Sequence, residues 1–281
     1  MTKAFTPDLT LSPLPPVIGV VASQVRHSCQ QKMLDEVTRQ LNARGVITVL
    51  LNADTDEAMT ALIRQATPLA LRGLLLLPGN KVINACNLPV LAIDAEPELQ
   101  ADALRAGEVT AALLLTQGHQ RFGFMQSQPD DIAQKQGYCT TLQAAGRTLD
   151  AELTAGSDDR DGAYLAMMHY LKKTRAAERI QALFCESDRL AFGAIQAVRD
   201  FGQGAYLAVA GFGDSEEAHS PTWHLTSWSP DIRQIIGSAL DRWLGEPAIS
   251  SGGKGQLQQR HSHSGKVLPG EMSACGCAFR H

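Results

Sequence analysis

The stretch ALFCESDRLAFGAIQAVRDFG, residues 182–202, places two carboxylates and a hydroxyl at the end of an apolar run. Glu186, Ser187 and Asp188 follow four apolar or small residues, and apolar residues then recur at helical spacing. We expect a buried strand that turns sharply into a helix, with Ser187 or Asp188 as the N-cap. Carboxylates at strand ends also serve as general bases in catalysis. The competing interpretation is an ordinary helix cap.

The other candidate motifs for catalysis or metal binding are incomplete. Ser187 has no surrounding G-x-S-x-G turn, and no base can be placed beside it for a catalytic triad. No nucleotide-binding glycine motif occurs. A zinc site is suggested by H-S-H and C-G-C, but their spacing fits no standard structural site. These four residues are His261, His263, Cys275 and Cys277. We therefore expect no metal and no cofactor.

The elements that must position the acidic turn alternate along the chain. Apolar strand candidates are followed by helical patterns, for example VIGVVA (17–22) before a helix with Met33, Val37 and Leu41 in register. This order, with strands apolar on both faces, predicts an α/β fold with doubly wound parallel sheets. Two lobes of about five strands each suit the length of 281 residues. Ligands bind outside the carboxyl ends of such strands, where Ser187 and Asp188 lie.

Composition bounds the partners and the compartment. The net charge of −4 and the absence of any Lys/Arg block argue against tight DNA binding by this chain alone. The first sixteen residues contain no apolar run of the length that a signal peptide or membrane helix needs. Six scattered cysteines fit reduced thiols. We expect a cytoplasmic protein that does not contact a membrane, with a mobile loop over 247–266 and a last strand in KVLPGEM.

Several segments, in order, resemble the effector-binding core of the LacI/GalR family of bacterial transcription regulators. They are VIGVVASQVRHSCQQKMLDEV, LRGLLLLP, LPVLAID, TQGHQRFGFM, QGYCTTLQAAG, ALFCESDRLAFGAIQAVRDFG, VAGFGDSE and HLTSWSPDIRQIIGSALDRWL. The resemblance covers roughly residues 17–275. TQGHQRFGFM, followed at family spacing by the SD turn and VAGF, is the most specific part. Within the family, IAQKQGY and FCESDRLAFGA look closest to gluconate-type repressors.

The resemblance implies a periplasmic-binding-protein-like type I fold, with two lobes, three crossovers and a ligand cleft between them. The implied domains are a linker (1–16), an N-terminal lobe (17–118 plus 231–248) and a C-terminal lobe (119–230 plus 249–281). The family's helix-turn-helix headpiece of about sixty residues is not in this chain. Operator DNA would therefore be bound only through a headpiece that is not present here.

The resemblance also implies ligand-binding residues. Asp188 falls where the family has an Asp that hydrogen-bonds ligand hydroxyls, and Ser187 stands in place of an Asn. Gln134 stands where many members have an Arg that binds ligand oxygens, so an anionic effector loses that anchor. The remaining candidates line the implied cleft, and for each a surface charge, cap or core role is the alternative. They are Gln24, Arg26, His27, Ser28, Asp102, Lys135, Phe212, Asp214 and Trp228.

The implied function is the sensing and dimerising core of a transcription regulator. A sugar, sugar acid or sugar phosphate would bind between the lobes, and the chain would pair as a homodimer. A stand-alone sugar-binding protein of transport or chemosensing is the alternative. An α/β enzyme that uses Asp102, Asp188 or Asp214 as a general base remains open. Our first interpretation is that the chain is not an enzyme.

Overall fold

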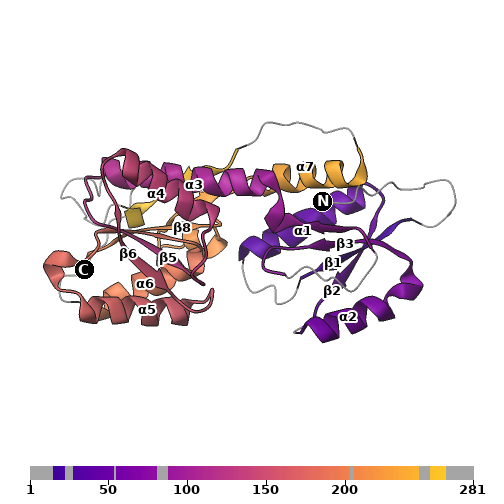
Figure 1. Cartoon of the computed structure of the whole chain (residues 1–281), viewed down its shortest axis with the longest axis horizontal. Coiled ribbons are helices and arrows are strands. Elements are labelled where there is room, and N and C mark those ends of the chain that lie inside the picture. Colours follow the sequence, from indigo (N-terminus) through magenta and orange to yellow (C-terminus); the bar gives the residue numbers. More distant parts are fainter. Residues whose placement is uncertain are drawn as a thin grey trace. The chain divides into compact units, whose positions relative to one another are not determined.

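The computed structural model describes residues 15–22, 28–53, 55–80, 88–202, 206–246 and 254–263 (Figure 1). The chain forms two compact units. Unit 1 combines Met1–Asp102 with Asp231–Lys254, and unit 2 combines Ala103–Pro230 with Gly255–His281. The chain passes between the units three times, as two lobes joined by three crossovers require. The first passage falls inside helix α3 (Pro97–Thr116), and the boundary expected from the sequence lies at residue 118.

Unit 1 is built on a parallel sheet of four strands in the order β2-β1-β3-β4. The strands are β1 (Val17–Val21), β2 (Ile47–Leu51), β3 (Leu71–Leu76) and β4 (Val90–Ala92). The helices of this unit are α1 (Ser28–Ala43), α2 (Asp56–Gln65) and α7 (Ile232–Leu244), with the first part of α3. The strands are apolar because helices cover both faces of the sheet.

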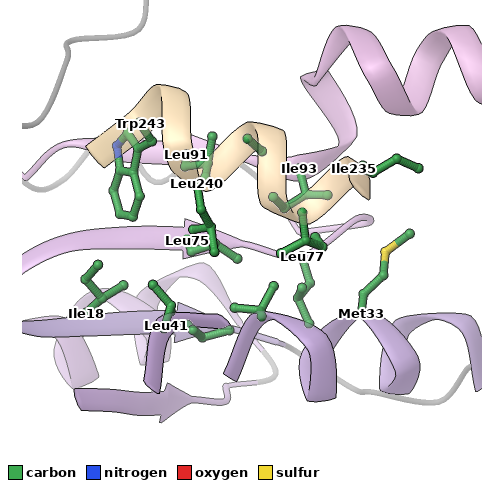
Figure 2. Packing of buried hydrophobic residues seen from close by; sticks show 14 of the residues in the cluster. Ile18, Met33, Leu41, Leu75, Leu77, Leu91, Ile93, Ile235, Leu240 and Trp243 are labelled. Atoms are coloured by element: carbon green, nitrogen blue, oxygen red, sulfur yellow. The ribbon is translucent and has the colours of Figure 1, made fainter. Parts of the chain in front are cut away.

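Alternation along the strands divides the core of unit 1 into two layers. Ile18 and Val20 of β1 pack in one layer with α1 and α7, whereas Val17 and Val21 pack in the other with α2. Figure 2 shows the first layer, in which α7 and α1 meet β3 and β4. Each fully buried aliphatic side chain of this kind contributes about 1.5–3 kcal/mol. The layers explain why both sets of alternate positions in these strands are apolar.

Unit 2 is built on six strands in the order β10-β9-β8-β7-β5-β6, of which only the β10 and β9 pair is antiparallel. The strands are β5 (Phe122–Gln126), β6 (Leu149–Thr154), β7 (Ala182–Cys185), β8 (Ala208–Phe212), β9 (Thr226–Ser229) and β10 (Gln256–Gln258). The helices are α4 (Ala133–Ala144), α5 (Arg160–Lys173) and α6 (Asp188–Phe201), with the rest of α3.

The helices of unit 2 cover the two faces of its sheet separately. On β7, Leu183 and Cys185 pack in the cluster that contains α5 and α6, and Ala182 and Phe184 pack in the cluster that contains α3 and α4. The same two-residue alternation runs through β8. The chain enters α6 directly from the buried carboxyl end of β7, so that end of the sheet is where polar side chains can gather.

Helices α3 and α4 approach so closely that two glycines are required where they cross. A Cβ on Gly107 would overlap the carbonyl oxygen of Gln134, and a Cβ on Gly137 would overlap that of Leu104. Glycine is otherwise unfavourable within a helix by about 1 kcal/mol relative to alanine. The close approach therefore explains both glycines and fixes the start of α4, where Gln134 and Lys135 lie.

The strands and helices expected from apolar periodicity are confirmed within the described residues, with four and six strands where about five each were expected. Strands β6 and β9 were missed. The prediction of a mobile loop over 247–266 is wrong for residues 254–263, which contain β10 and a short 3-10 helix, η5 (His261–His263). Backbone pairing to β9 holds this segment, so it needs little apolar periodicity. The strand expected in KVLPGEM lies outside the described residues.

Candidate functional site

The turn after β7 is held by its own side chains. Ser187 is the N-cap of α6, and its hydroxyl oxygen accepts a hydrogen bond from the backbone N–H of Leu190 at 3.3 Å. The Ser187 hydroxyl also donates to Asp158, in the loop that precedes α5. The N-cap expectation is confirmed for Ser187, and Asp188 is the first residue of the helix. The Asp188 side chain is therefore available for other contacts.

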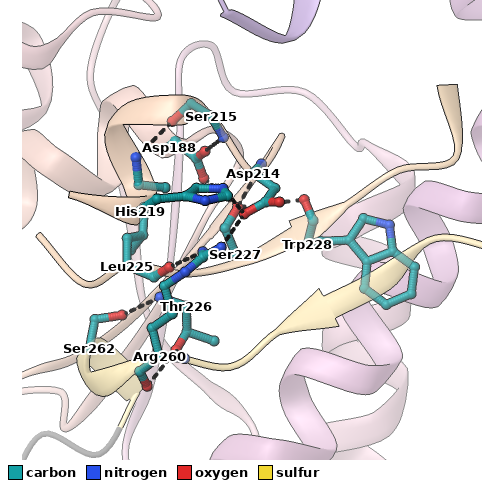
Figure 3. Close-up of polar contacts among 11 residues, drawn as sticks. Asp188, Asp214, Ser215, His219, Leu225, Thr226, Ser227, Trp228, Arg260 and Ser262 are labelled. Atoms are coloured by element: carbon teal, nitrogen blue, oxygen red, sulfur yellow. Dashed lines mark hydrogen bonds and ion pairs between the residues drawn. The ribbon is translucent and has the colours of Figure 1, made fainter. Parts of the chain in front are cut away.

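Asp188 is 3% exposed, and both of its carboxyl oxygens accept hydrogen bonds (Figure 3). The Ser227 hydroxyl donates to Oδ1 at 2.5 Å, and the backbone N–H of Ser215 donates to Oδ2 at 2.6 Å. A Cβ on Gly211 would overlap Oδ1, so the glycine leaves the space that this carboxyl group fills. Asp188 thus joins the ends of β7, β8 and β9.

Burial raises the pKa of Asp188 to about 6, because desolvation disfavours the charged form. The hydrogen bonds from Ser227 and Ser215 lower the pKa and offset part of this effect, and the nearby Asp214 raises it further. A carboxyl group with this pKa changes its protonation state close to neutral pH, as few carboxylates do.

Asp214 follows β8 in a left-handed conformation, with φ of 44°. Its backbone N–H donates to the Ser227 hydroxyl at 3.0 Å, and its Oδ1 accepts from Arg260 at 2.7 Å. His219 Nε2 lies 3.1 Å from the same oxygen (Figure 3). Asp214 is 7% exposed. These contacts place Asp214 and Asp188 in one network that meets at Ser227.

The segment after β10 completes this network, and it was not predicted from the sequence. The Arg260 guanidinium donates to the carbonyl oxygen of Leu225 and to Asp214, both at 2.7 Å. The Ser262 hydroxyl donates to the carbonyl of Val209 at 2.6 Å and accepts from the backbone N–H of Thr226 at 2.7 Å. Arg260 and Ser262 are therefore bound to the amino-terminal ends of β8 and β9, and Arg260 also reaches the loop after β8. The only signal in the sequence was an arginine and a serine in a polar stretch.

Glu186 contacts the neighbouring strand end. Its carboxylate accepts hydrogen bonds from the backbone N–H and the hydroxyl of Ser127, at 2.6 Å and 3.0 Å. Burial raises the pKa of Glu186, the bonds from Ser127 lower it, and the negative charges of Asp158 and Asp130 raise it further. The acidic turn thus extends to the loops after β5 and β6.

Gln134 and Lys135 lie in the first turn of α4, next to the same edge of the sheet. Both are half-buried. The Lys135 ammonium donates to Glu152 of β6, which also accepts from the Gln126 amide at 2.8 Å. Ile132, the residue before the helix, provides no side-chain cap. Lys135 is therefore an ion-paired cation beside the end of β5.

The other candidates fall into three groups. Phe212 and Trp228 pair in register on β8 and β9, and Trp228 is 1% exposed. The capping role that was the alternative to ligand binding for Asp102 is wrong, because α3 already begins at Pro97. Apolar spacing placed the start of this helix too late, because the first turn of the helix carries few apolar residues. Gln24, Arg26 and His27 lie outside the described residues, and Ser28 begins α1 with its side chain undescribed.

The structure thus brings together part of the predicted set. Asp188 and Asp214 lie in one network at the carboxyl ends of β7 and β8, with Ser215 and Ser227 added. Ser187 precedes Asp188 at the same edge, but its hydroxyl bonds to Asp158. Among the described residues no group of three or more His, Cys, Asp and Glu is arranged to hold a metal ion. Within the same part of the chain, no helix has the length and apolar character needed to span a bilayer.

Two α/β units joined three times, with polar side chains gathered at the carboxyl ends of the strands, define the class of binding proteins with a periplasmic-binding-protein-like fold. The family model of periplasmic binding proteins and the sugar binding domain of the LacI family matches residues 15–217. The chain belongs to this family.

Individual relatives are regulators. The HTH-type transcriptional regulator GalS of Salmonella typhimurium (strain LT2) is 29% identical over 119 residues, which are 40% of this chain. The match spans only 34% of the length of GalS. The transcription regulator GntR from Chromobacterium violaceum superposes with a TM-score of 0.70 at 23% identity, over 88% of this chain and 99% of that one. A lac repressor dimer bound to operator and the anti-inducer ONPF gives 0.70 at 17% identity, over 89% and 95%. The structural matches show the fold.

Proposed function

We propose that this chain is the effector-sensing core of a LacI-type transcription regulator. It binds a small polar molecule, of the sugar, sugar acid or sugar phosphate type, at the carboxyl edge of the sheet in unit 2. The observation that carries this proposal is the network of Asp188, Asp214, Ser215 and Ser227 at that edge, in a chain of this family. Open α/β sheets bind ligands at this edge.

The proposed binding residues divide by role. Ser187, Gln134 and Lys135 are half-buried and provide hydroxyl, amide and ammonium groups for direct contact. Asp188 and Asp214 are buried and accept bonds from the protein, so they hold the loops in place and add negative charge. Phe212 is half-buried and provides an apolar surface, which suits the C–H face of a sugar ring, whereas Trp228 is 1% exposed and supports that surface from the core. Gln24, Arg26, His27, Ser28 and Asp102 stay proposed contacts from unit 1.

Binding controls transcription by stabilising one arrangement of the protein over another. An effector shifts such an equilibrium only as far as its affinities for the two states differ. We propose a cytoplasmic homodimer, supported by the lac repressor dimer of the same fold, with operator DNA bound by a separate headpiece. The net charge of −4 supports a separate DNA reader. Light scattering at micromolar concentration should give twice the chain mass of 30.2 kDa, and a monomer would contradict the dimer.

The family includes periplasmic binding proteins, so a transport or chemosensing protein is the second candidate. The similarity to GalS favours the regulator. Because bound ligand recovered unchanged excludes catalysis on that ligand, the same binding experiment also separates both candidates from an enzyme.

A thermal-shift screen of sugars, sugar acids, sugar phosphates and amino sugars tests the proposal. A ligand at 100 times its dissociation constant stabilises the folded protein by about 2.7 kcal/mol. We expect at least one polyhydroxylated compound to raise the unfolding temperature in a saturable manner. No saturable shift with any member of the library would contradict the proposed function.

A further inference from the structure

The segment that contains β10 and η5 is attached to unit 2 by backbone pairing and polar side chains. Unit 1 ends at Lys254 and unit 2 resumes at Gly255, so this segment directly follows the third passage between the units. We call residues 255–263 the strap. Strand β10 of the strap pairs with β9 at the edge of the sheet, and Leu257, the only apolar side chain in the strap, is half-buried. Polar contacts therefore hold the strap, because it buries little apolar surface.

Arg260 is the main anchor of the strap. Its backbone N–H donates to the Thr226 hydroxyl oxygen at 2.8 Å, and the Thr226 hydroxyl donates to its carbonyl oxygen at 2.9 Å. Its guanidinium donates to the carbonyl oxygen of Leu225 and to the carboxylate of Asp214 (Figure 3). The side chains of Arg260 and Asp214 are 17% and 10% exposed, so solvent screens this ion pair less than a surface pair. One residue of the strap is thus bonded to the start of β9 and to the loop after β8.

Asp214 has a backbone conformation that needs support from its surroundings. Its φ is 44°, and the preceding Gly213 has a φ of 117°. Residues other than glycine are uncommon in this left-handed region and persist there when their contacts fix them. Arg260 and His219 bind the Asp214 carboxylate, and Arg260 is the less exposed of the two. Ser227 Oγ accepts the Asp214 backbone N–H. Arg260 and Ser227 therefore support the side chain and the backbone of this residue.

Two hydrogen bonds connect this loop to Asp188. Ser227 Oγ, which accepts the Asp214 N–H at 3.0 Å, donates to Asp188 Oδ1 at 2.5 Å. Ser215, the residue after Asp214, donates its N–H to Asp188 Oδ2 at 2.6 Å. A shift of the loop thus changes the donors of both carboxyl oxygens. All four residues are buried, and an unmade hydrogen bond in such a place is costly. The network is therefore expected to move as a unit.

We propose that the strap is a conformational device that couples the third passage between the units to the carboxyl edge of unit 2. Docked, it holds the loop after β8 against Asp188, with Arg260 as the positioning residue; released, it loosens that network. Coupling between two sites is reciprocal, so a ligand that binds at this edge and favours one arrangement of the loop also changes how tightly the strap docks. The coupling is a property of the chain itself. Its test needs no ligand and can fail while the proposed function stands.

Hydrogen exchange at one end of the network after a change at the other end tests the coupling. Asp188→Ala removes the carboxyl group, and exchange in the strap should become at least ~5-fold faster, with a smaller change in α5. Glu186→Ala is the matched control, because it removes a carboxyl group at the same edge that bonds to Ser127 instead. It should leave exchange in the strap within ~2-fold of wild type. Unchanged exchange in Asp188→Ala, or equal acceleration in both variants, would overturn the coupling.

A double-mutant cycle keeps the proposal testable if Asp188→Ala does not fold. In Arg260→Met the charge of Asp214 loses its cation and repels Asp188, and Asp188→Asn removes this repulsion. At pH 7.5 the double variant should therefore be more stable than the two single effects predict, by at least ~3-fold in the unfolding equilibrium constant. Asp150→Asn makes the same change on β6, at the far edge of the sheet, and should combine additively with Arg260→Met. Additivity in both pairs would overturn the coupling.

Discussion

Asp188→Asn should remove a pH dependence of stability that the wild-type protein has. The pKa of Asp188 is about 6 in the folded state against an ordinary value of 3.8, so between these values the folded state binds the proton more tightly than the unfolded state. The free energy of unfolding therefore falls as pH rises from about 4 to about 6. At 1.36 kcal/mol for each pKa unit, the full difference is ~3 kcal/mol.

Asparagine is a suitable replacement because the site can accommodate it. Its carbonyl oxygen can accept from the Ser215 N–H, and its amide can donate to the Ser227 hydroxyl, which reorients. The variant cannot titrate, so its stability should not follow the wild-type profile. Relative to wild type, Asp188→Asn should gain ~3 kcal/mol between pH 4 and pH 7.5.

Urea unfolding at a series of pH values measures this difference. A Trp243→Phe background leaves Trp223 and Trp228, both in unit 2, as the fluorescence probes, so the transition of that unit is followed. Asp161→Asn, at an exposed position in α5, is the control and should keep the wild-type profile. Parallel profiles for wild type and Asp188→Asn would refute the account of this buried carboxyl group.

Packing and loop anchoring give further predictions. Gly107→Ala should lower the free energy of unfolding by about 1–3 kcal/mol, because the added methyl group overlaps α4. Gly237→Ala is the control at a helical position with more space, and it should change the free energy of unfolding by less than ~1 kcal/mol. Equal effects of the two substitutions in urea unfolding would contradict the close contact between α3 and α4. Arg260→Met should lower the free energy of unfolding by about 2–5 kcal/mol and speed hydrogen exchange around Asp214. Arg39→Met, which breaks an ion pair at the surface, is the control and should leave both close to wild type. If hydrogen exchange around Asp214 in Arg260→Met is as slow as in the wild type, residues 254–263 do not hold the loop after β8.

Apolar periodicity was sufficient to predict most of the fold because both faces of each sheet are covered. The run at 182–185 is apolar at every position, and its two faces enter separate clusters. Strand β6 was missed because it lies at an edge, and its alternating half-buried and exposed positions carry Asp150, Glu152 and Thr154. Edge strands are expected to contain few apolar residues, and apolar periodicity therefore does not detect them.

The site was predictable only where it follows a strong local pattern. Ser187 and Asp188 were identified since a strand, a cap and a helix are contiguous there. Ser227 and Arg260 join the same network from 39 and 46 positions away from their partners, and no local pattern marks them. Tertiary contacts of this type depend on how the strands are ordered in the sheet, which spacing along the chain does not specify.

Calorimetric titration of the best ligand from the screen into wild type and Ser187→Ala tests the central claim most directly. Because Ser187→Ala also removes a helix cap worth ~1 kcal/mol, Thr55→Ala, which removes the N-cap of α2 in unit 1, is the matched control. The account predicts one site per chain, ligand recovered unchanged, binding at least ~5-fold weaker in Ser187→Ala, and wild-type binding in Thr55→Ala. Wild-type affinity in Ser187→Ala, or conversion of the ligand, would contradict effector binding at the carboxyl edge of unit 2.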